Sequence, residues 1–188
     1  LIVGNYILGR DFFSVISSTR ISREQVEEVR RISRRLMGLG IVQETAGQID
    51  LQCSIDPTKF KIDMLLRRLS VIASTIHSHA LQALAEADQQ VADDAIRRED
   101  EADMMYWLSL RLLISAQRDR TIADKIGLED PSQILYYALV TRYLELIADR
   151  AVYIARMAIE LQHGSEKSLK LARRGSSQTL PGAAGNIR

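Results

Sequence analysis

Two pairs of carboxylate residues with the same spacing are the best candidates for chemistry in this chain of 188 residues. Glu99 and Asp103 lie four positions apart in the run EDEAD, and Glu145 and Asp149 lie four positions apart in ELIAD. On an α-helix, residues i and i+4 project from the same face one turn apart, so each pair would present two carboxylates side by side. Acidic ligands from two neighbouring helices are a typical way for a helical bundle to hold a cation.

The second pair is predicted to be buried. At about 100° per residue, the apolar side chains of Ile134, Ala138 and Val152 project in nearly the same direction as Glu145, so this pair interrupts an apolar stripe. Buried carboxylates require a metal ion, a shift in protonation or an arginine partner. The sequence leaves two alternatives open, a metal site and ion pairing with a nearby arginine such as Arg142, Arg156, Arg67 or Arg68.

The first pair has a simpler alternative. Glu99 and Asp103 belong to an acidic run that begins at Asp93, and such a run is often a solvated helix face. Only its pairing with Glu145 and Asp149 on an adjacent helix favours a cation site.

The elements that would position these residues fall into two units. Residues 1–56 predict a small α+β unit with a strand over 12–16, a helix that opens with a Ser22–Gln25 capping box, and a hairpin over 41–55. Residues 57–163 predict a mainly α domain, an antiparallel three-helix bundle whose first and third helices open at Asp56–Pro57 and Asp130–Pro131. The last helix is expected to stop at Gly164, and residues 164–188 are expected to form a mobile basic tail.

Composition excludes several classes of function. With 25 basic and 24 acidic residues, the chain lacks the basic excess of a nucleic-acid-binding protein. The single cysteine excludes an intramolecular disulfide and a thiolate zinc site. No run of about 18 uncharged apolar residues occurs, so we expect no direct membrane insertion and a cytoplasmic location. Phosphate-binding loops and serine-nucleophile motifs are also missing, so a nucleotide-driven or serine-nucleophile mechanism has no support.

Two segments resemble a known family. REDEADMMYWLSLRLL (98–113) and TRYLELIADRAVYIARMA (141–158) are similar to the two signature segments of the PhoU family of helical-bundle proteins. Residues 1–163 resemble archaeal PhoU-like proteins in which an α+β segment precedes a single PhoU repeat. Leu146 and Arg150 depart from the usual pattern, which has an arginine and a histidine at these positions.

The resemblance implies a regulator of phosphate uptake and phosphate homeostasis that acts through protein–protein interaction and is not an enzyme. It implies a metal site at Glu99, Asp103, Glu145 and Asp149, because the family's Glu/Asp-x-x-x-Asp motifs bind metal clusters. The cation would be divalent or ferric, from among Fe, Zn, Mn, Mg and Ca. The implied partners are the phosphate transporter ATPase, a sensor kinase and further copies of the chain.

Two alternatives remain at this stage. Many archaeal relatives carry an AbrB-type DNA-binding domain upstream, and Leu1 is not an initiator methionine. The chain would then be the oligomerisation or effector module of an AbrB-type transcription regulator, and nucleic acid would be contacted only through that missing domain. A carboxylate-bridged metal enzyme is disfavoured because the Glu-x-x-His motif at Glu160 and His163 occurs once.

Overall fold

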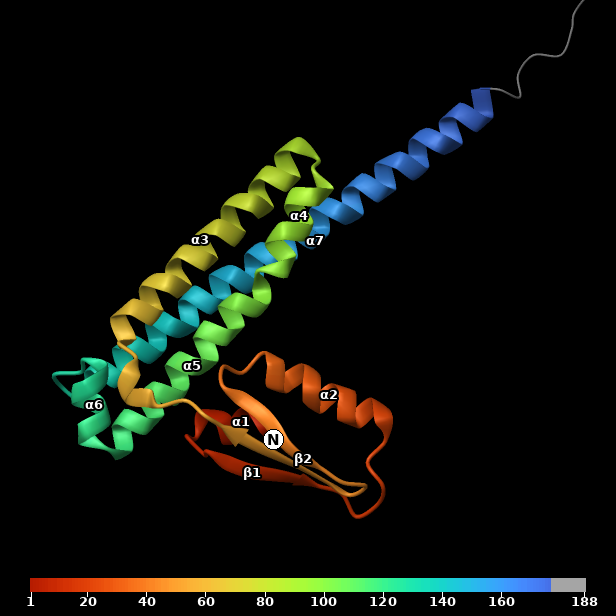
Figure 1. The fold of residues 1–188 in the computed structure, drawn as a ribbon. Coiled ribbons are helices and arrows are strands. Elements are labelled where there is room, and N and C mark those ends of the chain that lie inside the picture. The colour runs from red at the N-terminus through yellow and green to blue at the C-terminus, as the bar shows by residue number, and fades with distance from the viewer. Residues whose placement is uncertain (177–188) are drawn as a thin grey trace, which may run out of the picture.

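The computed structural model describes residues 1–176, and side chains as far as Gly164. It has a small α+β unit packed beside a helical bundle, as the sequence predicts (Figure 1). The N-terminal unit contains α1 (Ile2–Ile7), β1 (Phe12–Ile16), α2 (Arg23–Arg34), β2 (Leu39–Glu44) and β3 (Gln48–Cys53). The bundle contains η1 (Pro57–Lys59), α3 (Ile62–Glu86), α4 (Gln89–Arg97), α5 (Glu99–Arg118), α6 (Arg120–Ile126) and α7 (Gln133–Ser176).

The N-terminal sheet is antiparallel, with β3 between β1 and β2. Ile49 and Leu51 on the central strand are fully buried. The predicted capping box of α2 is confirmed: the Ser22 side chain accepts from the Gln25 amide, and the Gln25 side chain accepts from the Ser22 amide. Gly38 turns the chain from α2 into β2 with a φ of +72°, and a Cβ there would lie 2.5 Å from Ile55 Cγ1. Any other residue at this position would be strained.

The bundle is built from α3, the consecutive pair α4 and α5, and α7 (Figure 1). Its core consists mainly of leucine, isoleucine and alanine side chains at helical spacing, such as Leu69, Ile76 and Leu108. α6 packs across the end of the bundle near the start of α3, and α7 extends beyond the other end. Within the described residues, no helix is both long and apolar enough to cross a membrane.

Three predicted helix limits are corrected. Asp56 caps the short helix η1 through the Thr58 amide, and the extended Phe60 and Lys61 then delay the start of α3 to Ile62. The segment 119–129, predicted as a break, contains α6, whose N-cap is Asp119.

The predicted stop at Gly164 is also wrong, because α7 continues to Ser176. A glycine inside a helix costs only about 1 kcal/mol relative to alanine, so it need not end one. The rest of the predicted mobile tail, residues 177–188, lies outside the described residues.

Candidate metal centre

The structure brings three of the four predicted ligands together where α5 packs against α7. Asp103 projects from α5, and Glu145 and Asp149 project from α7. One carboxylate oxygen from each residue lies within 4.8 Å of those of the other two. We call Asp103, Glu145 and Asp149 the carboxylate cluster. Its members come from both repeated Glu-x-x-x-Asp motifs.

Glu99 lies outside this cluster. Glu99 is the first residue of α5. Its carboxylate accepts a hydrogen bond from Arg156 Nη2 at 2.8 Å. Glu99 and Asp149 nevertheless line the same surface cavity of about 440 Å³, together with Arg142 and Arg156. Glu99 therefore stands at the edge of the candidate site and pairs with Arg156, an arginine that the sequence offered as a partner for Glu145 and Asp149 instead.

Two arginines form ion pairs with members of the cluster. Arg142 forms an ion pair with Glu145 from one turn earlier on α7. Arg35, the C-cap residue of α2, pairs with Asp103, and its Nε lies 3.0 Å from Asp100 Oδ1. The contact from Arg35 could not be read from the sequence, because it joins residues 68 positions apart and α2 carries several other arginines.

The cluster is costly to keep ionised. As whole residues, Glu145 and Asp103 are 6% and 9% exposed. This burial is the main cause that raises the pKa of each carboxyl. The negative charge of Asp149 raises both pKa values further, while Arg142 and Arg35 oppose the rise at Glu145 and Asp103 respectively. The arginines thus offset only part of the desolvation and repulsion.

The donor set fits a metal cation. Three carboxylates that converge on one point provide an all-oxygen site, which suits hard cations such as Mg²⁺, Ca²⁺, Mn²⁺ and iron. The raised pKa values at Glu145 and Asp103 show that the cluster still gains from additional positive charge. Tyr106 lies beside the cluster, with its ring centroid 5.9 Å from the Arg142 guanidinium carbon, and burial raises the pKa of its phenol.

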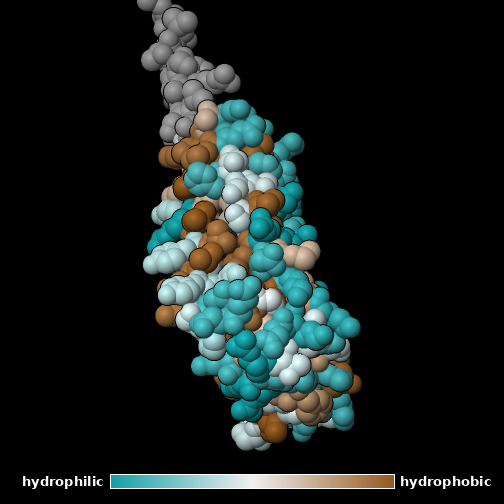
Figure 2. All heavy atoms as spheres, turned by 90° about the vertical axis from the view of Figure 1, so that its left-hand side faces the viewer, coloured by the Kyte–Doolittle hydropathy of each residue, from teal (hydrophilic) through white to brown (hydrophobic). Residues whose placement is uncertain are grey.

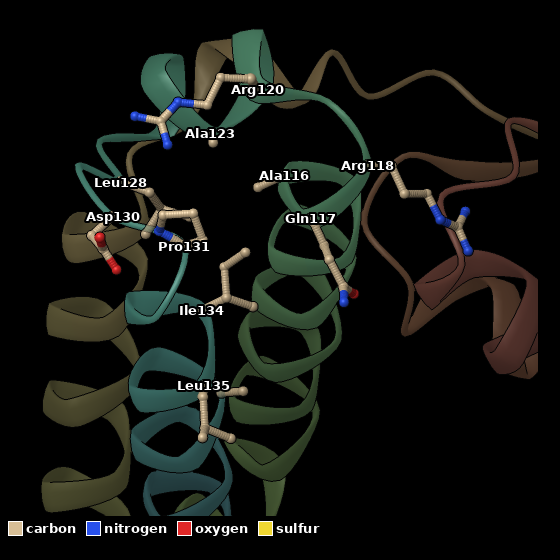
Figure 3. A pocket seen from close by; sticks show the side chains of 11 residues that line it. Ala116, Gln117, Arg118, Arg120, Ala123, Leu128, Asp130, Pro131, Ile134 and Leu135 are labelled. Carbon is tan, nitrogen blue, oxygen red and sulfur yellow. The ribbon is translucent and has the colours of Figure 1, made fainter.

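A separate pocket of about 610 Å³ lies at the α6 end of the bundle (Figure 3). Its floor includes the small side chains of Ala116 and Ala123. Its charged groups have partners within the chain: Arg118 donates to the Leu8 carbonyl and Arg120 donates to the Glu129 carbonyl. No member of the carboxylate cluster lines this pocket.

Comparison with known families supports the assignment of the bundle. The family model for the PhoU domain matches residues 66–158, a segment that contains both Glu-x-x-x-Asp motifs and the whole carboxylate cluster. Searches of curated proteins and of solved structures gave no significant match. The matched segment runs from the first turns of α3 into α7 and so covers the three helices of the bundle. Residues 66–158 of this chain form a PhoU domain.

Proposed function

We propose that this protein is a PhoU-like regulator of phosphate uptake that acts by binding other proteins and has no catalytic activity. PhoU-domain proteins are generally regulators and not enzymes, and the PhoU domain at residues 66–158 implies partners in a phosphate transport system. The observation that carries the proposal is the convergence of Asp103, Glu145 and Asp149 within the matched segment.

The carboxylate cluster would hold a divalent or ferric cation, with Glu99 at the edge of the site. When bound, such a cation would neutralise the cluster and offer free coordination positions to an anionic group or to an acidic side chain of a partner. Asp103 comes from α5 and the other two ligands from α7, so the ligand set ties these two helices together. Arg142 holds Glu145 in place through an ion pair on the same helix.

The partners would be the ATPase component of a phosphate transporter and a sensor kinase, both reached from the cytoplasm. The cavity lined by Glu99, Asp149 and Arg156 opens at the surface and would present the bound cation to them. The alternative, an effector module for an AbrB-type regulator, stays a prediction from resemblance, and no described residue favours it over the first.

Elemental analysis of the purified full chain tests the metal site. We expect a stoichiometric transition metal, Mg or Ca in the wild type after incubation with each cation, and its loss in the Glu145→Gln/Asp149→Asn double variant. Glu160→Gln is the matched control, because Glu160 is an exposed acid on the same helix. A wild type that binds none of these cations would refute the metal site while leaving the regulatory role open.

Phosphate uptake in cells tests the regulatory role. Deleting the gene in the source organism is expected to release uptake from control when phosphate is abundant, and the wild-type gene should restore control. Restoration by the Glu145→Gln/Asp149→Asn variant would separate regulation from the carboxylate cluster. Unchanged uptake in the deletion strain would contradict the proposed function.

A further inference from the structure

A groove of about 660 Å³ runs between α3 and α7 on the outside of the bundle. The two helices pack against each other, and hydrophobic side chains gather along the bundle between hydrophilic ones on the side that Figure 2 shows. Residues of both helices line this hollow, which we call the α3–α7 groove, and no member of the carboxylate cluster is among them. The groove is therefore distinct from the candidate metal centre, and its volume is typical of small-molecule sites, which span about 300–1,000 Å³.

The α3 side of the groove carries three hydrogen-bonding side chains. Ser74 and Ser78 lie four positions apart and so share one face of the helix, and His77 precedes Ser78. All three residues are exposed, and none of their side chains has a hydrogen-bond or ion-pair partner within the described part of the chain. A serine hydroxyl and an imidazole N–H each donate one hydrogen bond, so this wall offers three free donors.

Arg150 gives the α7 side of the groove a positive charge that no lining residue balances. Among the arginines of α5 and of residues 133–164 of α7, the others bind a carboxylate or a carbonyl oxygen of the chain: Arg111, Arg118, Arg142 and Arg156. Arg150 has no such partner among the residues whose side chains the structure describes. No acidic side chain lines the groove. An unpaired guanidinium opposite three hydrogen-bond donors is complementary to an oxyanion.

The surface around Arg150 is apolar. Ile147 and Ile154 lie about one turn before and one turn after it on α7, and Leu146 lies about one turn before it as well. Ala151 is 1% exposed and carries a single methyl group, so it lies deep in the groove and leaves space above it. The groove thus joins a cationic patch rich in donors to an apolar wall, and a matching ligand has both an anionic group and an apolar body.

We propose that the α3–α7 groove binds a small organic phosphate, in which a phosphoryl group is joined to an apolar or aromatic body. The guanidinium of Arg150 binds two phosphoryl oxygens, and the donors of the α3 wall bind the third. A phosphoryl group presents three acceptor oxygens where a carboxylate presents two, so it makes better use of four donor side chains. The apolar body packs on Ile147 and Ile154. Binding at this site requires neither a cation nor a protein partner, so the proposal is independent of the proposed function.

Calorimetric titration of the full chain with 1-naphthyl phosphate tests the ligand class. EDTA is present throughout, because Arg150 also borders the cavity beside the carboxylate cluster and a cation there would itself bind phosphate. We expect saturable binding that is at least about tenfold tighter than that of 1-naphthol, which lacks the phosphoryl group, and of inorganic phosphate, which lacks the rings. No saturable binding below about 1 mM 1-naphthyl phosphate would overturn the proposal. Equally tight binding of 1-naphthol would show an apolar site without anion recognition and would overturn it as well.

Variants of the lining residues test the location. Arg150→Gln should weaken the binding of 1-naphthyl phosphate at least about tenfold, and Ser74→Ala/Ser78→Ala should weaken it at least about threefold. Arg67→Gln is the matched control and should leave the affinity unchanged, because Arg67 is an exposed arginine of α3 whose side chain lies outside the groove. Circular dichroism checks that each variant is folded. Unchanged affinity in Arg150→Gln or in the double serine variant, or an equal loss in Arg67→Gln, would overturn the proposal.

Discussion

Arg35 of the N-terminal unit forms an ion pair with Asp103 of the carboxylate cluster and so places a positive charge from one unit in the candidate metal site of the other. The Arg35 side chain is 36% exposed and that of Asp103 is 12% exposed, so the contact is partly shielded from solvent. A metal ion at Asp103 would therefore bind in competition with an arginine that is already present.

The first prediction concerns this competition. Arg35→Gln should tighten Mn²⁺ binding about fivefold in calorimetric titration, because an ion pair of this kind is worth about 1 kcal/mol. Arg34→Gln is the control, since Arg34 is an exposed neighbour that donates to the Arg30 carbonyl. Equal affinities in the wild type and both variants would mean that Arg35 does not compete with the cation.

The second prediction separates Glu99 from the other carboxylates. Since Arg156 already holds Glu99, Glu99→Gln should keep the metal stoichiometry and change the affinity by less than about threefold. Asp103→Asn should lower the affinity by at least about tenfold, because it removes a charged ligand from the cluster. Equal losses of metal affinity in the two variants would show that Glu99 is a ligand as well.

The third prediction is a dependence on pH. Burial raises the pKa of Glu145 in the folded chain, so its contribution to stability is present below the unfolded pKa and is lost as the pH rises through the folded pKa. Glu145→Gln stays neutral at every pH. With chelator present, it should raise Tm at pH of about 7 and have little effect at pH of about 4, near the unfolded pKa of glutamate.

The loss of the Arg142 ion pair in this variant costs less than about 1 kcal/mol, because the Arg142 side chain is half exposed. Glu160→Gln, measured in parallel, should shift Tm little at either pH. A lower Tm for Glu145→Gln at neutral pH would contradict the predicted sign.

The fourth prediction concerns the attachment of the N-terminal unit. Arg111 on α5 is 2% exposed, and its guanidinium donates to the Tyr6 carbonyl at 2.7 Å and to Asp11 Oδ1 at 2.5 Å. Arg111→Met should lower the free energy of unfolding by about 2–4 kcal/mol in urea titrations, since these charged hydrogen bonds are lost. Asp11→Asn should cost less than about 1 kcal/mol, because the Asp11 side chain is 74% exposed. Similar losses would locate the energy in the ion pair instead of the carbonyl contacts.

Local signals predicted much of the fold. The Ser22–Gln25 capping box and the alternating strands of the N-terminal unit depend on neighbouring residues, and the structure confirms them. The prediction that the long helix begins at Asp56 was wrong, because an aspartate before a proline can cap a single short turn as well as a long helix. Whether the helix continues depends on packing several residues later, which no short motif encodes.

The candidate site, too, could be predicted only in part from the sequence. Helical spacing was sufficient to bring Glu145 and Asp149 to one face and to direct Asp103 toward them. The same spacing could not show that Glu99 pairs with Arg156, because that contact depends on how α5 and α7 are placed and on the reach of the Arg156 side chain. Arg35 was not predicted at all, since its contact depends on how the two units dock.

Because of the carbonyl contacts of Arg111, the family-matched segment depends on residues that lie outside it. Arg111 lies within residues 66–158, yet the acceptors of its hydrogen bonds are Tyr6, Arg10 and Asp11, which lie far before that segment. Excision of residues 66–158 would leave a cation in an apolar helix face without its acceptors, and Asp103 would lose Arg35 at the same time. The N-terminal unit thus supplies hydrogen-bond acceptors for Arg111 and an arginine partner for Asp103 that residues 66–158 do not contain.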